Sequence, residues 1–216
     1  MHPDYTSTVL RSPTNALVVP PPGLTERTGP RFGSGTVRAT DSDLTVHGRG
    51  EPIGERIVVH GGVTDSAGGP VRRALIELWQ ANAAGRYVHA HDDHPAPLDP
   101  NFVGAGRTLT DDDGRYRFVT IKPGPYPWRN HHNAWRPAHL HLSLLGRAFT
   151  QRLVTQMYFP GDPLFFQDPI FNSIRDERLR HRLVAAYDHA ATVPEWATGY
   201  RFDIVLGGAA ATPLDG

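Results

Sequence analysis

Short strand-like segments, separated by glycine and proline turns, dominate this chain. Its 216 residues include 22 glycines and 20 prolines, which interrupt helices and long strands. Between them lie short runs with the β-branched content or the apolar–polar alternation of strands. Such spacing predicts an all-β fold, an antiparallel β-sandwich. The predicted strands span residues 56–63, 74–80, 115–119, 139–145, 152–159 and 200–206.

One segment near the C-terminus has a helical pattern instead. Residues 176–191 carry acidic side chains in their first turn, and Pro194 follows their end. Their apolar residues fall at helical spacing. We therefore expect a short C-terminal helix, with its apolar stripe formed by Leu179, Leu183, Val184 and Tyr187.

The first fifty residues differ from the rest. They are rich in Pro, Gly, Thr and Arg and show weak periodicity, which is typical of an extended arm. Such a long stretch without its own elements is a poor independent unit. We expect residues 1–50 to pack on the core or on a partner chain, and residues 51–216 to form one β-sandwich domain.

Composition excludes several classes of site and partner. The absence of cysteine excludes disulfides, thiolate metal sites and iron–sulfur clusters. A formal net charge of +0 favours neither nucleic acid nor an anionic membrane as a partner. No apolar run is long enough to span a bilayer, and the N-terminus has no signal-like apolar stretch, so we expect a cytoplasmic location.

The most informative motif is PYPWRNHHNAWRPAHLHL, at residues 125–142. His139 and His141 lie one residue apart on a predicted strand, so both imidazoles point to the same face. Tyr126, between two prolines, offers a phenolate thirteen residues upstream. Imidazoles with phenolate oxygen suit a hard, high-valent metal such as Fe(III) better than zinc. Without its context, the same pattern also fits two histidines on a half-exposed strand.

Several blocks together resemble one family. YPWRN, WRPAHLHL, LDPNF, DDDGRYRF, TIKPGPYPW and YRFDIVL follow in order at compatible spacing. They resemble the intradiol ring-cleaving dioxygenases, and more narrowly the beta chains of protocatechuate 3,4-dioxygenases. The resemblance runs from about residue 3 to about residue 207, nearly the whole chain.

The resemblance implies a metal site and a reaction. It implies that Tyr87, Tyr126, His139 and His141 bind Fe(III). Two ionised tyrosines need a strongly Lewis-acidic cation, because a free phenol has a pKa of about 10. The implied reaction is cleavage of protocatechuate by O2 to 3-carboxy-cis,cis-muconate. The implied partner is a homologous alpha chain, in a heterodimer that assembles further.

Further residues receive roles by the same resemblance. Arg136 and Gln156 would act beside the metal, and Arg136 can stabilise negative charge on the substrate. Trp128 would form an aromatic wall over a flat ring. Tyr5 and Arg11 match an arm that reaches the substrate channel, where Arg11 would attract an anion.

Alternatives remain at this point. His89, His91 and His94 form a rival metal signature beside Tyr87, but the family has its ligand at the tyrosine, so we expect them near the mouth of the site. Catechol or hydroxyquinol is an alternative substrate. A transthyretin-like binding subunit without catalysis is an alternative from another class of protein.

Overall fold

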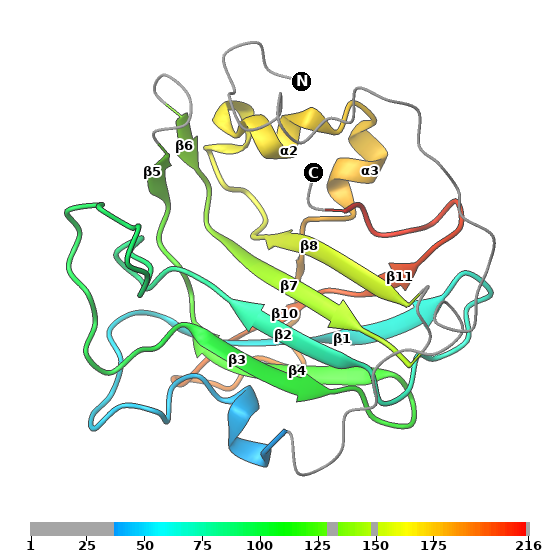
Figure 1. Cartoon of the computed structure of the whole chain (residues 1–216), viewed down its shortest axis with the longest axis horizontal. Helices are drawn as coiled ribbons and strands as arrows, with labels where there is room; N and C mark the ends of the chain where they lie inside the picture. The colour runs from blue at the N-terminus through cyan, green and yellow to red at the C-terminus, as the bar shows by residue number, and fades with distance from the viewer. Residues whose placement is uncertain (1–36, 129–133, 148–150, 215–216) are drawn as a thin grey trace.

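Two β-sheets face each other across one core. The structure is a computed structural model that describes residues 37–128, 134–147 and 151–214 (Figure 1). The first sheet contains β1 (Arg56–Asp65), β4 (Arg115–Ile121), β9 (Ala186–Tyr187), β10 (Thr198–Arg201) and β11 (Ile204–Leu206). The second, in the order β3-β2-β7-β8, contains β2 (Leu75–Trp79), β3 (Ala105–Leu109), β7 (His139–Leu145) and β8 (Arg152–Tyr158).

Smaller elements lie around this sandwich. A two-stranded ribbon is formed by β5 (Tyr126–Trp128) and β6 (Ala134–Arg136). The helical turns within the described residues are short: η1 (Ala39–Ser42), η2 (Phe165–Gln167), α2 (Pro169–Ser173) and α3 (Glu177–His181). Figure 1 shows α2 and α3 together at one end of the sandwich, beyond β8. No helix within the described ranges has the length and apolarity needed to cross a membrane.

The core lies between the two sheets and explains the predicted alternation. On β7, Leu140, Leu142 and Leu144 are fully buried in the core cluster. Successive strand residues point to opposite faces, so His139 and His141 lie on the outer face of the same sheet. The all-β sandwich predicted from the sequence is confirmed, and each of the predicted strand regions contains a strand.

The last predicted strand is interrupted. The run at residues 200–206 divides into β10 and β11, which both pair with β1, and both in parallel. At the break, the Phe202 N–H donates to His60 O at 2.8 Å, and the Gly62 N–H donates to Asp203 Oδ1 at 2.9 Å. The break lets two short strands continue along one long strand, so the first sheet is mixed and not purely antiparallel.

The predicted helix at residues 176–191 is too long. Asp176 caps α3 by accepting from the Arg178 N–H, but α3 ends at His181. Beyond it, the Tyr158 N–H donates to Leu183 O at 2.7 Å and the Ala185 N–H donates to Tyr158 O at 2.9 Å. Strand-like pairing with β8 therefore replaces the helix, although the apolar spacing is helical.

Part of the predicted arm contributes to the core. Leu44 is fully buried, and its N–H donates to Val119 O at 2.9 Å. Tyr5 and Arg11 lie outside the described residues. The division at residue 50 stays a prediction.

Adjacent glycines on β1 give a test of this arrangement. A side chain at Gly61 would overlap the carbonyl oxygen of Phe202, which also accepts from the Tyr116 hydroxyl at 2.5 Å. At Gly62 a Cβ would approach no atom closer than Asp203 Oδ1, at 3.8 Å. We expect Gly61→Ala to lower the free energy of unfolding by about 1–3 kcal/mol, because the added Cβ pushes Phe202, between β10 and β11, away from β1. Gly62→Ala, the matched control, should change it by less than about 1 kcal/mol. Equal losses in denaturant unfolding would contradict this account.

Candidate metal-binding site

Strand β7 places two imidazoles side by side on the outer face of the second sheet. His139 pairs with Tyr158 of β8, and His141 lies between Trp79 of β2 and Gln156 of β8. The ring of Trp79 stacks on His141, with centroids 4.9 Å apart and planes 3° apart. A central strand with a neighbour on each side holds these side chains in a fixed register.

Two tyrosines approach the histidines from separate segments. Tyr126 begins β5, and Tyr87 lies in the loop after β2. Gly85, with a φ of 77°, lets this loop approach the Pro125 carbonyl so closely that any side chain would overlap it. The loop is also tied by the Tyr87 N–H, which donates to Asp92 Oδ2 at 2.7 Å. As a result, the two phenol rings meet edge to face, 5.4 Å apart.

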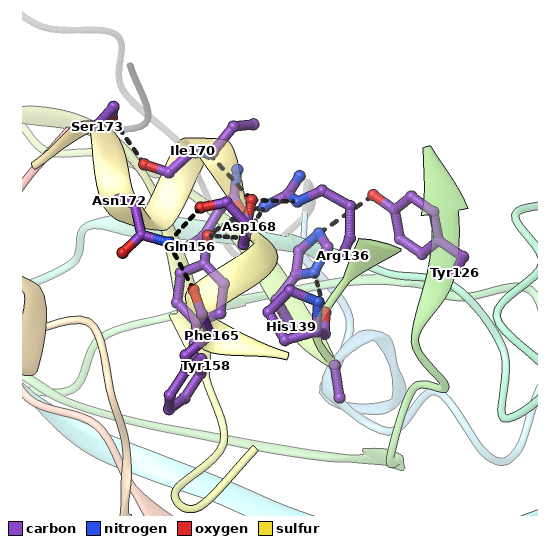
Figure 2. Close-up of polar contacts among 12 residues, drawn as sticks. Tyr126, Arg136, His139, Gln156, Tyr158, Phe165, Asp168, Ile170, Asn172 and Ser173 are labelled. Atoms are coloured by element: carbon purple, nitrogen blue, oxygen red, sulfur yellow. Dashed lines mark hydrogen bonds and ion pairs between the residues drawn. The ribbon is translucent and has the colours of Figure 1, made fainter. Parts of the chain in front are cut away.

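The four side chains converge through their polar atoms. The Nε2 atoms of His139 and His141 are 3.2 Å apart. The Tyr126 hydroxyl lies 3.3 Å from His139 Nε2, and the Tyr87 hydroxyl lies 3.2 Å from His141 Nε2. Figure 2 shows the Tyr126 hydroxyl directed at the His139 ring. The structure thus brings together all four residues that the sequence analysis selected as ligands.

A backbone contact sets the tautomer of His139. Its Nδ1 lies 2.7 Å from the carbonyl oxygen of Pro137, which only accepts hydrogen bonds. The proton of the neutral ring is therefore on Nδ1, and the lone pair of Nε2 is free to bind a metal. Such a contact to the second ring nitrogen is common for histidines that bind metals.

Burial keeps Tyr87, Tyr126 and His139 uncharged when no metal ion is bound. Burial, followed by the neighbouring Tyr126, raises the pKa of Tyr87 well above its usual range, and burial also raises the pKa of Tyr126. Burial and the charge of Arg136 lower the pKa of His139 well below that of a free imidazole. Both phenols are thus protonated and His139 is neutral at pH 7. A bound cation would reverse the state of the phenols.

A cavity of about 1130 Å³ opens onto this cluster. Tyr87, Tyr126 and His141 reach its wall, together with the aromatic rings of Trp79, Trp128 and Trp135. None of the described residues that line it is a lysine or an arginine. Its aromatic walls suit a flat ring, and the donor cluster at its base is where a metal would meet such a ring.

Arg136 and Gln156 lie behind the cluster and are almost completely buried. Arg136 faces Tyr126 across the β5–β6 ribbon. Its guanidinium lies 5.2 Å from the ring centroid of Trp128. Gln156 Oε1 accepts from the Arg136 Nη2. The residues predicted to act beside the metal are therefore adjacent to the four-residue cluster, while their roles stay predictions.

Two further residues that contact Arg136 are not among those predicted from the sequence. Asp168 is fully buried and forms an ion pair with Arg136, and Tyr158 is fully buried with its hydroxyl 3.1 Å from Asp168 Oδ2. Neither lies in the histidine motif. One local signal was available for Asp168, because it stands directly before Pro169, an arrangement typical of a helix N-cap.

The rival histidines lie where the sequence analysis expected them. His89, His91 and His94 line the cavity, with His89 and His91 exposed at its rim. Within the described part of the chain, no three His, Cys, Asp or Glu residues are grouped to hold a metal ion. The candidate site differs because it combines two histidines with two tyrosines.

Two models of known families match the chain. The family model described as "Dioxygenase" matches residues 27–208. A second model, "Protocatechuate 3,4-dioxygenase beta subunit N terminal", matches residues 1–22. The first matches most of the chain, including every residue of the candidate site. The second covers Tyr5 and Arg11.

Individual relatives and a solved structure indicate the same family. The chain is 55% identical to the protocatechuate 3,4-dioxygenase beta chain of Burkholderia cepacia, over 100% of this chain and 92% of the relative. It is 32% identical to the protocatechuate 3,4-dioxygenase alpha chain of Pseudomonas putida, over 74% of this chain and 75% of the relative. The solved 3-chlorocatechol 1,2-dioxygenase of Rhodococcus opacus is similar with a TM-score of 0.56 at 27% identity, over 83% of this chain and 70% of that chain. The chain therefore belongs to the intradiol ring-cleaving dioxygenase family and, within it, to the beta chains of protocatechuate 3,4-dioxygenase.

Proposed function

We propose that this chain is the iron-bearing beta subunit of an enzyme that cleaves protocatechuate with O2 to 3-carboxy-cis,cis-muconate. The observation that carries the proposal is the convergence of Tyr87, Tyr126, His139 and His141. It occurs in a chain 55% identical to a protocatechuate 3,4-dioxygenase beta chain. Site and relatives support the same reaction.

The donor set fits ferric iron. The Nε2 atoms of His139 and His141 are 3.2 Å apart, a separation at which both can bind one cation. Phenolate oxygen prefers a hard cation, whereas the thiolates that zinc favours are absent from the chain. Tyr87, Tyr126, His139 and His141 would hold the ion. When bound, Fe(III) would supply Lewis acidity and the electron-accepting centre for the reaction of a catechol with O2.

Tyr126 is suited to move a proton. It begins the short ribbon strand β5, away from the central sheet that fixes the two histidines. In its ionised form, the phenolate oxygen is a base that can take the proton of a substrate hydroxyl. The charge of Arg136 favours that ionised form, because it lowers the pKa of Tyr126 against the effect of burial.

Arg136 and Trp128 are suited to hold and stabilise the ring. The indole of Trp128 lines the cavity and lies against the guanidinium of Arg136. Cleavage places negative charge on the aromatic ring, and a guanidinium stays protonated throughout. In a site closed to water, a fixed positive charge next to developing negative charge lowers the barrier.

The carboxylate of the substrate needs a partner from elsewhere. The described lining of the cavity contains neither lysine nor arginine. We propose that Arg11 and Tyr5 of the N-terminal segment, together with a homologous alpha chain, complete the pocket. The 32% identity to an alpha chain supports descent of both chains from one ancestor, as in a heterodimer of related subunits.

The alternative functions make different predictions. A catechol or hydroxyquinol dioxygenase would bind iron in the same way but would not prefer a carboxylated substrate. A transthyretin-like binding subunit would hold no iron and would be colourless. Co-expression with the homologous alpha chain, iron analysis and oxygen uptake with protocatechuate and catechol separate the three readings.

The metal ligands can be tested with two pairs of histidines from this chain. His139→Ala and His141→Ala should each lose iron, and turnover should fall by at least about a hundredfold, since each change removes a nitrogen donor. His89→Ala and His91→Ala are the matched controls, because they form the same H-x-H pattern at the rim of the cavity. They should retain iron. Full iron content in either His139→Ala or His141→Ala would exclude that residue as a ligand.

Substrate preference tests the assignment to protocatechuate. A carboxylate held by arginine is a charge-assisted contact worth about 1.5–3 kcal/mol, so kcat/KM should be about ten- to a hundredfold higher for protocatechuate than for catechol. Arg11→Gln should reduce this ratio and leave turnover of catechol unchanged. The assay requires the complete complex of both chains. A kcat/KM for catechol equal to that for protocatechuate would exclude the substrate but not the intradiol reaction.

A further inference from the structure

Asp168 forms a completely buried ion pair with Arg136. The exposed fraction is 0% for Asp168 and 2% for Arg136. Asp168 Oδ2 accepts a hydrogen bond from the Arg136 Nη2 at 3.1 Å, and Oδ1 forms an ion-pair contact with Nε at 3.0 Å (Figure 2). Contacts from both oxygens of one carboxylate restrict how the guanidinium can turn.

The carboxylate is itself held in place. Asp168 is the N-cap of α2, where its Oδ1 accepts from the Ile170 N–H at 3.0 Å. The Tyr158 hydroxyl lies 3.1 Å from Oδ2, and the side chain of Asn172 donates to the Asp168 carbonyl at 2.9 Å. Asp168 is therefore anchored to β8 and α2, whereas Arg136 comes from β6. The ion pair joins the ribbon of the candidate site to this anchor.

The contacts also determine which side of the guanidinium is used. Asp168, Gln156 and Tyr158 all contact Arg136 through Nε or Nη2. The Cζ atom of the same group lies over the Trp128 ring, 5.2 Å from the ring centroid. Figure 2 shows Arg136 between Asp168 and Tyr126. A guanidinium held along one edge presents its opposite edge, with the Nη1 donors, in a fixed direction.

We propose that Asp168 is a positioning residue for ring cleavage, which fixes the Arg136 guanidinium so that its Nη1 edge faces the reacting ring. The inference rests on the proposed function, because it assigns Asp168 to the same reaction. The negative charge also compensates a guanidinium that is otherwise buried away from water. Without it, Arg136 would reorient toward water and lose its direction.

The variant Asp168→Asn tests the charge and keeps most of the shape. Its side-chain oxygen can still cap α2 at the Ile170 N–H. In the co-expressed complex, we expect unchanged iron content and a similar dissociation constant for protocatechuate, measured without O2 by the change in visible absorption. We expect kcat to fall about tenfold to a hundredfold, as for a misplaced catalytic group, while KM changes by less than about threefold.

A matched control is available on the next helix. Asp176 caps α3 in the same way and pairs with Arg178 at 3.2 Å, but Arg178 is exposed. Asp176→Asn therefore removes the charge of a helix cap whose ion-pair partner is exposed to solvent. Its kcat should stay within about twofold of wild type, because exposed pairs contribute little.

A double-mutant cycle shows whether Asp168 acts through Arg136. If it does, Asp168→Asn should change kcat by less than about twofold when Arg136 is already Gln, because the group to be positioned is absent. The comparison of Arg136→Gln with the double variant also serves if Asp168→Asn alone does not fold, because neither protein carries a buried arginine.

Three results would overturn the inference. The first is a kcat of Asp168→Asn equal to that of Asp176→Asn in an active complex. The second is the same fold loss in both Arg136 backgrounds, which would make the role of Asp168 independent of Arg136. The third is a wild-type complex without iron or turnover, which would contradict the proposed function itself and, with it, the role of Asp168.

Discussion

The alternation of side chains along β7 is the constraint on which both the core and the candidate site depend. Leu140, Leu142 and Leu144 are buried between the sheets, so His139 and His141 must point to the opposite face. A slip of one residue would move the leucines to the outer face of the sheet and the imidazoles into the core between the sheets. The free energy of core packing therefore holds the two nitrogen donors in register, and folding and construction of the site are one process.

Burial and one neighbouring ion pair determine the charges in and around the cluster. Burial keeps the phenols protonated and His139 neutral until a cation arrives, so the site holds donors that are desolvated and aimed at one point. Among the described residues, the positive charge of Arg136 acts on all three of these groups, and the carboxylate of Asp168 compensates it. A neutral pair of this kind is a permanent dipole in a medium of low polarity, where such dipoles act strongly.

Much of this arrangement was predictable from the sequence, and the exceptions have physical reasons. Strand positions and the His139/His141 pair follow from local alternation, and Tyr126 stands in the same motif. Tyr87 lies 54 residues from His141 and was found only through family resemblance. Asp168 was missed because its partner, Arg136, is 32 residues away, and only the fold brings them together. The helix expected at residues 176–191 ends early because pairing of residues 183–185 with Tyr158 prevails over helical spacing.

We expect two tyrosines and two histidines of this chain to share one ferric ion. Resonance Raman spectroscopy of the iron-loaded complex tests it most directly, because vibrations of metal-bound tyrosinate are enhanced selectively when the visible band is excited. The wild type should show two sets of tyrosinate bands, one lost in Tyr87→Phe and the other in Tyr126→Phe, with both retained in Tyr187→Phe at the surface. A wild-type spectrum without tyrosinate bands, or one that neither Tyr87→Phe nor Tyr126→Phe alters, would contradict it.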